Sequence, residues 1–203
     1  MSENKKEEVL ERSGPVFNPP VYIQRYTTVR DILFKLPGVV KVVDFGCAEG
    51  NFIKYLKKLP FATEISCIDL HEPSLEKAVH VSRPNAWDFV FKRHQPLKIK
   101  IFKGSALEND FRLQGYDAVT CIELCNGVLD RFPDYTVKIQ GVGDPPPESS
   151  HLGSLSQLAV FMLKASSTRH PYTINSNAPA ETYVLIDEHI YPGRSQADSE
   201  QVT

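Results

Sequence analysis

A glycine-bearing loop between two apolar runs is the feature of this sequence that most constrains how the chain folds. The run Val39–Val43 leads into a loop at residues 44–50, and a helical pattern follows at Asn51–Lys58. A second apolar run, Ile65–Ile68, ends on the carboxylate Asp69. Strand, glycine turn, helix, strand and terminal acid predict the nucleoside-binding half of a doubly wound α/β sheet. Ligands of such sheets bind at the carboxyl ends of the strands, and the acid after the second strand binds the ribose hydroxyls.

The spacing of the glycines indicates which nucleoside the loop binds. Dinucleotide sites use G-x-G-x-x-G, because the pyrophosphate must approach bare backbone at a helix N-terminus. Here only Gly46 and Gly50 remain, and Glu49 places a negative charge where a phosphate would lie. This pattern disfavours NAD and suits S-adenosylmethionine, which has no phosphate and carries a positive sulfonium and a positive amine. The expected cofactor contacts are Asp44, Gly46, Glu49, Gly50 and Asp69. A strand-to-helix turn without a ligand is the alternative.

Length and composition are those of one globular domain with extensions. The chain has 203 residues, of which 41% are hydrophobic and 24% charged, and its net charge is −2, which says little about its partners. No window approaches about 18 uninterrupted apolar residues, so no membrane span is expected. The charged start at residues 1–12 lacks an apolar signal segment, and we expect a cytoplasmic protein. Free thiols in a reducing compartment are expected of Cys47, Cys67, Cys121 and Cys125.

Hydrophobic periodicity predicts the other elements. Apolar residues at helical spacing predict a helix at Tyr22–Leu36, which Pro37 and Gly38 end. Further helices are expected at residues 50–59 and 73–81, and strands at residues 41–45, 65–70, 98–103, 117–124, 135–142, 157–163 and 182–191. The lysines of residues 98–103 favour a strand at the edge of the sheet, because charge discourages pairing with other chains.

The same pattern divides the chain into three parts. Residues 1–14 are polar and are expected to form a disordered arm. Residues 15–164 are expected to carry the domain. Residues 165–203 are expected to contain a linker, the last strand and a loose tail.

Three segments carry a resemblance to a known family. Phe17–Tyr26 reads FNPPVYIQRY, Cys121–Leu124 reads CIEL, and Gly141–Pro146 reads GVGDPP. With them the chain resembles the Hen-type small-RNA 2'-O-methyltransferases, which modify the 3'-terminal ribose of piRNAs, siRNAs or plant microRNAs. The resemblance runs from about Phe17 to Leu163 with one interruption, and F-x-P-P-x-Y-x-Q-R is its most specific part. A proline-stiffened lead-in that caps the domain is the plainer interpretation of that element.

The resemblance implies a fold and a reaction. The fold is α/β, the Rossmann-like class I S-adenosylmethionine-dependent methyltransferase fold, with a mostly parallel sheet and a C-terminal antiparallel strand pair. The reaction moves a methyl group to the 2'-oxygen of the last nucleotide of a small RNA. In the family Mg²⁺ or Mn²⁺, held by two Glu and two His, binds the 2'- and 3'-hydroxyls, and a metal there lowers the pKa of the attacking hydroxyl. By match to the family's motifs, Glu123 is the catalytic metal ligand, and Asp69 and Ser105 contact the cofactor.

The lead-in segment implies the contacts to RNA. Tyr22, Gln24 and Arg25 lie in it and are expected to bind the RNA 3' end. The family further implies a monomer that receives its RNA from an Argonaute- or Piwi-type protein. A separate group of basic residues consists of Lys92, Arg93, Lys98, Lys100 and Lys103. Binding of RNA phosphates and a solvated edge strand are the two interpretations of this group.

The chain departs from the family after its fourth strand, where the family continues E-L-I-E-H-L. Asn126 and Gly127 stand in the places of the second Glu and of a His. An amide oxygen is a weak neutral ligand, and glycine has no side chain. Enough chain for one strand and at least one helix is missing between Leu124 and Cys125, including the region of the last metal-binding His. We therefore expect one central strand to be absent, as in a splice form or an internally deleted gene model.

Two consequences are expected from this interruption. A hydroxyl attack without its metal loses charge stabilisation, so methyl transfer should be very low. The missing strand should leave the flank of Asp117–Glu123 bare and the product poorly soluble, unless Thr182–Tyr191 fills the gap. A chain that binds cofactor or RNA without methyl transfer is therefore a second hypothesis. A dehydrogenase is a third, and Glu49 and the missing glycines argue against it.

Overall fold

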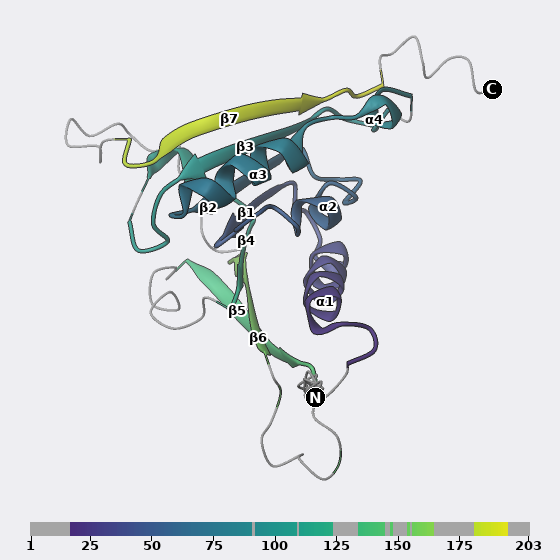
Figure 1. Ribbon diagram of the computed structural model, residues 1–203, viewed down its shortest axis with the longest axis vertical. Helices are drawn as coiled ribbons and strands as arrows, with labels where there is room; N and C mark the ends of the chain where they lie inside the picture. Colours follow the sequence, from purple (N-terminus) through teal and green to yellow (C-terminus); the bar gives the residue numbers. More distant parts are fainter. Residues whose placement is uncertain are drawn as a thin grey trace, which may run out of the picture.

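Seven strands form one mixed sheet in the order β5-β6-β4-β1-β2-β3-β7 (Figure 1). The computed structural model describes residues 17–90, 92–108, 110–123, 134–144, 147, 154, 156–164 and 181–194. The strands are β1 (Lys41–Phe45), β2 (Glu64–Asp69), β3 (Leu97–Lys103), β4 (Ala118–Ile122), β5 (Tyr135–Val142), β6 (Ser156–Leu163) and β7 (Val184–Tyr191). Strands β1 to β4 run parallel, whereas β5, β6 and β7 are antiparallel to their neighbours.

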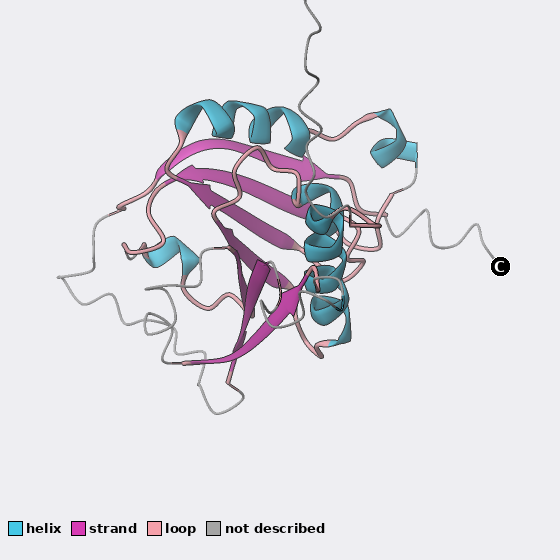
Figure 2. Ribbon diagram, turned by 60° about the horizontal axis from the view of Figure 1, so that its bottom comes forward, coloured by secondary structure: helices cyan, strands magenta, loops and turns pink. Residues whose placement is uncertain are grey.

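The longer helices cover one face of this sheet (Figure 2). The helices are α1 (Val21–Lys35), α2 (Ile53–Leu56), α3 (Glu72–Ser82) and α4 (Ala86–Val90), with a 3-10 turn η1 (Phe111–Leu113). Successive residues of a strand point to opposite faces, so Val42 packs beneath the helices while Val43 joins a second cluster on the other face. Strands β1, β2 and β4 are buried on both faces, which explains their apolar runs, whereas β3 alternates buried residues with half-buried lysines.

Most of the predicted elements are confirmed. Helix α1 matches the predicted Tyr22–Leu36, and β1, β2, β4, β5 and β6 lie within a residue or two of their predicted ranges. Strands β5 and β6 form the predicted antiparallel pair. Helix α2 is shorter than predicted, because its first residues form the turn that follows Gly50. The predicted arm at residues 1–14 lies outside the described residues.

The prediction that residues 98–103 form an edge strand is wrong. Strand β7 pairs antiparallel with β3 along its whole length and takes the edge position itself. The lysines of β3 lie beside carboxylates instead of protecting an edge, and the Lys98 ammonium is 3.4 Å from the Glu188 carboxylate on β7.

The expected bare flank of β4 is also contradicted. Strand β6 pairs directly with β4, from Ala118 opposite Met162 to Ile122 opposite Leu158. No strand of the described residues lies between β4 and β6, as expected if a central strand is missing. The gap is closed by β6 and not by residues 182–191, which form β7 at the opposite end of the sheet (Figure 1). The reason given for poor solubility therefore no longer holds.

The buried carboxylate of Asp110 holds the start of β7 against the rest of the domain through hydrogen bonds. Asp110 accepts hydrogen bonds from the Arg112 guanidinium at 2.6 Å and from the backbone N–H groups of Thr182 at 3.0 Å and Tyr183 at 2.9 Å. Arg112 also donates to the carbonyl of Tyr183. At the far end of β7 the Tyr191 hydroxyl donates to the Ser82 carbonyl at 2.6 Å. Both ends of the strand are thus held by buried polar contacts.

No helix among the described residues is long and apolar enough to cross a membrane.

Candidate functional site

The parallel register of β1 to β4 brings four loops to one edge of the sheet. Carboxyl ends of parallel strands meet at the same edge. Phe45 pairs with Ile68 and with Cys121, and Asp69 pairs with Lys103, so the segments after all four strands lie side by side. The loops that follow carry the predicted site residues Gly46, Asp69, Ser105 and Glu123.

Asp69 organises the glycine loop. Its Oδ2 accepts a hydrogen bond from the backbone N–H of Ala48 at 2.8 Å, and its Oδ1 accepts one from the backbone N–H of His71 at 2.8 Å. The backbone N–H of Gly46 donates to the carbonyl of Ile68 at 2.8 Å. Gly46 and Ala48 both have positive φ, at 74° and 46°. The loop is therefore folded tightly around the carboxylate that ends β2.

Gly50 ends this loop against α3, and we expect Gly50→Ala to lower the free energy of unfolding by about 3 kcal/mol. Its φ is +75°, and a Cβ there would lie 2.9 Å from the Ala78 Cα and 2.9 Å from the Ile53 side chain. Gly38→Ala is the control, because Gly38 has a φ of +73° with nothing within 4 Å of the added Cβ. Urea unfolding should find only about 1 kcal/mol of loss for the control. Equal losses would show that the contact with α3 is unimportant.

Asp44 lies fully inside the protein at the end of β1. Burial, with a smaller contribution from the nearby charge of Asp69, raises its pKa to about 7, and the hydrogen bond with Thr120 opposes the rise. The Thr120 hydroxyl lies 2.7 Å from Asp44 Oδ1 and 3.2 Å from the Val43 carbonyl. The Thr120 hydroxyl donates to the Asp44 carboxylate, which favours the charged form of Asp44.

Glu49 points out of the loop toward α3. Its carboxylate lies 2.5 Å from the Lys77 ammonium, and the hydrogen bond with Lys77 lowers the pKa of Glu49. Glu49 is therefore negatively charged at neutral pH. The contact with Lys77 places the Glu49 carboxylate at the rim of the glycine loop.

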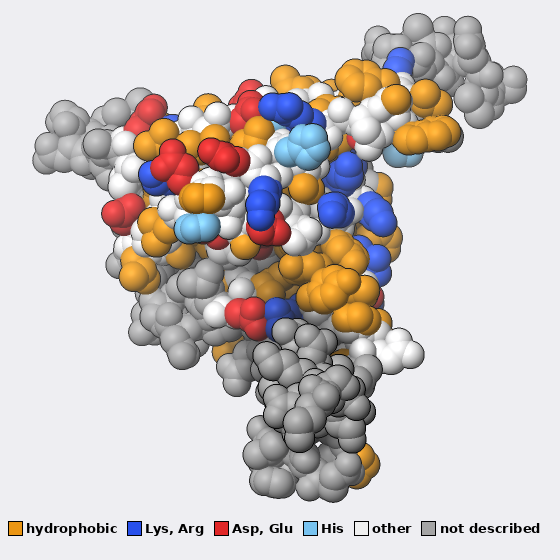
Figure 3. All heavy atoms as spheres, viewed as in Figure 1, with side chains coloured by type: hydrophobic (Ala, Val, Ile, Leu, Met, Phe, Trp, Pro, Cys, Tyr) orange, Lys and Arg blue, Asp and Glu red, His pale blue; other side chains and the backbone are white. Residues whose placement is uncertain are grey.

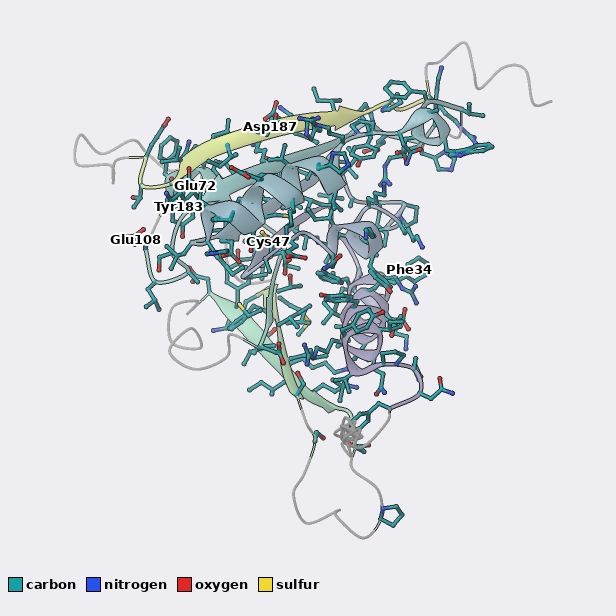
Figure 4. All side chains as sticks on the ribbon, viewed as in Figure 1. Phe34, Cys47, Glu72, Glu108, Tyr183 and Asp187 are labelled. Carbon is teal, nitrogen blue, oxygen red and sulfur yellow. The ribbon has the colours of Figure 1, made fainter. Side chains whose placement is uncertain are left out.

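The start of β7 supports the loop that carries Ser105 (Figure 4). The Tyr183 hydroxyl lies 2.6 Å from the carbonyl of Ser105 and 2.9 Å from that of Glu108. A Cβ on Gly104 would lie only 2.2 Å from the Tyr183 ring, so the glycine lets the ring lie flat against the backbone. The Ser105 hydroxyl accepts a hydrogen bond from the N–H of Leu107 at 3.1 Å, which closes a short turn.

Glu123 follows β4 in a strained backbone conformation. Its φ is 65°, in the left-handed region that costs a non-glycine residue about 1–2 kcal/mol. Its Oε1 lies 2.7 Å from an Arg25 guanidinium nitrogen and 3.3 Å from the Ser156 hydroxyl. Strain of this kind clusters at functional sites. The contact joins α1 to the ends of β4 and β6.

The other predicted RNA contacts lie on the first turn of α1. Tyr22 is 52% exposed, and the Gln24 amide donates to the Pro19 carbonyl at 2.7 Å. Tyr26, one turn further, packs on Tyr22 with ring centroids 6.2 Å apart. Burial, the charge of Asp44 and, more weakly, that of Glu123 raise the pKa of the Tyr26 hydroxyl. The structure therefore brings this turn of α1 beside the carboxyl ends of β1 and β4.

The described residues do not form a metal centre. No three His, Cys, Asp or Glu side chains in this part of the chain are grouped as metal ligands. The one predicted ligand, Glu123, is paired with the Arg25 guanidinium, which has no lone pair to give a metal. A hard divalent cation needs several oxygen ligands, so the residues that the structure describes do not fit the family's metal.

The basic group predicted near β3 is occupied by internal contacts. The Arg93 guanidinium donates to the backbone carbonyls of Lys57, Leu59 and Ala62. The three lysines of β3 each form an ion pair: Lys98 with Glu188, Lys100 with Glu64 and Lys103 with Glu72. These cations hold the fold together, and they do not form the continuous phosphate track that the sequence allowed. Of the four cysteines, Cys47 and Cys67 are free thiols as predicted, Cys121 is buried, and Cys125 lies outside the described residues.

Sequence comparison finds relatives that are named small RNA 2'-O-methyltransferases, and no family model matches. Mouse small RNA 2'-O-methyltransferase is 27% identical over 89% of this chain and 60% of the relative. The Drosophila melanogaster enzyme of the same name is 24% identical over 90% of this chain and 66% of the relative. That of Bombyx mori is 36% identical over 63% of this chain and 31% of the relative. The alignment with the mouse protein is 239 residues long, whereas this chain has 203, so the relative has internal segments that this chain lacks.

Solved structures show the same fold. The small RNA methyltransferase HEN1 superposes with a TM-score of 0.55 at 18% identity, covering 92% of this chain and 28% of the other. The methyltransferase domain of a bacterial Hen1 protein superposes with a TM-score of 0.51 at 22% identity, covering 71% of this chain and all of the other. The chain has the Rossmann-like class I methyltransferase fold, and it spans about 60% of the mouse relative.

Proposed function

We propose that this chain, which is a relative of the Hen-type small RNA 2'-O-methyltransferases, binds S-adenosylmethionine and the 3' end of a small RNA. By descent its reaction is 2'-O-methylation of the terminal nucleotide. The observation that carries the proposal is the glycine loop folded around Asp69, with the Ser105 and Glu123 loops beside it at the same sheet edge.

In this proposal the cofactor lies across the carboxyl ends of β1, β2 and β3. Asp69 accepts hydrogen bonds from the ribose hydroxyls, and the Ser105 turn lies next to the base. Asp44 and Glu49 supply negative charge for the amine and the sulfonium. Gly46 and Gly50 leave the backbone open to the methionine part. S-adenosylmethionine supplies the methyl group, and these side chains orient it.

The RNA end is proposed to lie between α1 and the end of β4. The Arg25 Nε is buried and has no hydrogen-bond partner among the described residues, which suits a guanidinium that still lacks an acceptor. Phosphate and ribose oxygens of an RNA end are such acceptors. Tyr22, which is exposed, and Gln24, which is half-buried, precede Arg25 on the first turn of α1 and complete the proposed contacts.

A chain that binds without methyl transfer is the second candidate, and the Arg25–Glu123 ion pair favours it. The family's Mg²⁺ or Mn²⁺ would need Glu123 free and joined by further ligands, and here the carboxylate faces a cation. Nothing else at this edge of the described structure can replace the charge that a metal places on the attacking hydroxyl.

The wider setting is also proposed from the relatives. We propose that residues 15–164 form the methyltransferase domain and that residues 165–203 contain a linker, the last strand, which is β7, and a loose tail. We further propose a cytoplasmic monomer that receives its RNA, a piRNA or a related class, from an Argonaute- or Piwi-type protein. Size-exclusion chromatography with light scattering tests the monomer.

We expect methyl transfer by this chain to be at least about 1,000-fold slower than by a full-length relative, because several kcal/mol of charge stabilisation are missing. The measurement is transfer of radiolabelled methyl to a single-stranded RNA with a free 3' end, with and without Mn²⁺. The mouse relative is the positive control. Turnover within tenfold of that control would show that the chain completes its site in another way.

A further inference from the structure

Aromatic side chains continue from the candidate site along α1 and α2; Tyr22 and Phe34 are exposed, whereas Tyr26, Tyr55 and Phe61 are half-buried against the core. The Tyr26 ring lies 5.4 Å from both the Phe52 and the Tyr55 rings. Further along α1, Phe34 is 60% exposed and its ring lies 6.0 Å from that of Phe61. Figure 3 shows hydrophobic side chains gathered on this side of the molecule, with Lys and Arg side chains beside them.

Two exposed lysines of the same region have no acidic partner. Lys54 and Lys58 lie on or just after α2, and neither forms an ion pair within the described part of the chain. The Lys58 ammonium lies 5.8 Å from the centre of the Tyr55 ring. The lysines of β3, by contrast, are all neutralised by carboxylates. The positive charge that remains available here therefore lies among aromatic rings.

These residues form one surface that begins at the candidate RNA-end site. We call it the aromatic–lysine face; it consists of Tyr22, Tyr26, Phe34, Tyr55, Phe61, Lys54 and Lys58. Tyr26 forms the inner end of this face and follows Arg25 in the sequence. Burial and the charges of Asp44 and Glu123 raise the pKa of its hydroxyl. Phe34 lies at the outer end, on the side of α1 that points away from the sheet (Figure 4).

We propose that the aromatic–lysine face binds the single-stranded nucleotides that precede the RNA 3' end. Aromatic rings stack on bases of any sequence, and interleaved cations neutralise the phosphates between them, which is the chemistry of single-strand binding. We propose RNA as the ligand because Lys54 and Lys58 supply positive charge that no carboxylate among the described residues neutralises. A purely apolar partner would not need this charge. This inference rests on the proposed function, since it extends the same RNA from the site outward.

The test measures the affinity of the full chain for a 12-nucleotide single-stranded RNA, labelled at its 5' end, by fluorescence anisotropy. Phe34→Ala should weaken binding about tenfold through the loss of one stacked base. Lys58→Glu should weaken it about fivefold and reduce the salt dependence, because each phosphate contact adds about 0.7 to the slope of log affinity against log salt. Matched controls are Trp87→Ala, an exposed aromatic on α4, and Lys138→Glu, an exposed lysine on β5; both should bind as the unaltered chain does.

The outcomes separate this inference from the proposed function. Equal RNA affinities for all four variants, with S-adenosylhomocysteine binding intact, would overturn the aromatic–lysine face and leave the methyl-donor site standing. The same result is expected if a protein partner covers this face instead of RNA. Failure of the unaltered chain to bind either ligand would overturn both proposals. Weakened RNA binding with unchanged S-adenosylhomocysteine binding supports the face alone.

Discussion

Replacing Asp69 with alanine should weaken S-adenosylhomocysteine binding about 100-fold. The carboxylate accepts two backbone hydrogen bonds that fold the glycine loop, and in our proposal it also accepts the ribose hydroxyls. Hydrogen bonds to a charged group contribute about 1.5–3 kcal/mol each, and about 1.4 kcal/mol corresponds to a tenfold change in affinity. Isothermal titration calorimetry measures the loss.

Asp69→Asn is the matched variant for this result. It keeps the shape of the side chain but turns an amide NH₂ toward one of the two N–H donors of Ala48 and His71. We expect an intermediate loss of about tenfold, since one acceptor survives. Cofactor affinity that is unchanged in both variants would place the ligand elsewhere.

Replacing Asp110 with alanine should lower the free energy of unfolding by about 3 kcal/mol, because it leaves the Arg112 guanidinium and two buried backbone N–H groups without their acceptor. Urea unfolding measures the effect. Glu181→Ala is the matched control, since Glu181 contacts the same arginine at 3.3 Å from an exposed position. It should cost less than about 0.5 kcal/mol. Equal losses would contradict a specific role of Asp110 in holding β7.

The same carboxylate gives the stability a defined pH dependence. Burial alone would raise its pKa, but hydrogen bonds from Arg112 and from the backbone of Tyr183 prevail and lower the pKa of Asp110 from 3.8 to about 2. A depressed pKa stabilises the fold above the unfolded value, so this contribution is complete above about pH 4 and is lost as the pH falls toward about 2. Unfolding curves over this range should converge for the unaltered chain and for Asp110→Ala; a constant difference between them would contradict the linkage.

Much of the sheet could be predicted from local sequence, and the misses have a common cause. Alternation of apolar and polar residues, apolar runs and the glycine loop locate β1 to β6 within a few residues. They do so because the burial pattern of each strand is visible in the residues of that strand itself. Which strand lies beside which depends on partners far along the chain. The lysines of β3 resemble an edge until Glu188 of β7, some 90 residues later, is known to lie beside them. The closure of β4 by β6 was likewise invisible to local pattern.

The same distinction between local pattern and distant partners applies to the residues of the candidate site. Asp69 could be located from the strand pattern, whereas Glu123 was singled out by its match to the family's motif; the parallel register of β1, β2 and β4 brings the ends of their strands to one edge. The partner of Glu123 could not be located from sequence, since Arg25 lies almost a hundred residues earlier and reaches it only through the packing of α1. Tyr183 was also missed, although the glycine at position 104 is a local trace of the ring that lies on it.

A calorimetric titration of the full chain with S-adenosylhomocysteine tests the central claim most directly. A methyl-donor pocket built on Asp69 and the glycine loop predicts saturable binding with one site per chain, with or without Mn²⁺. The absence of saturable binding at millimolar ligand, in a chain that unfolds cooperatively, would contradict it.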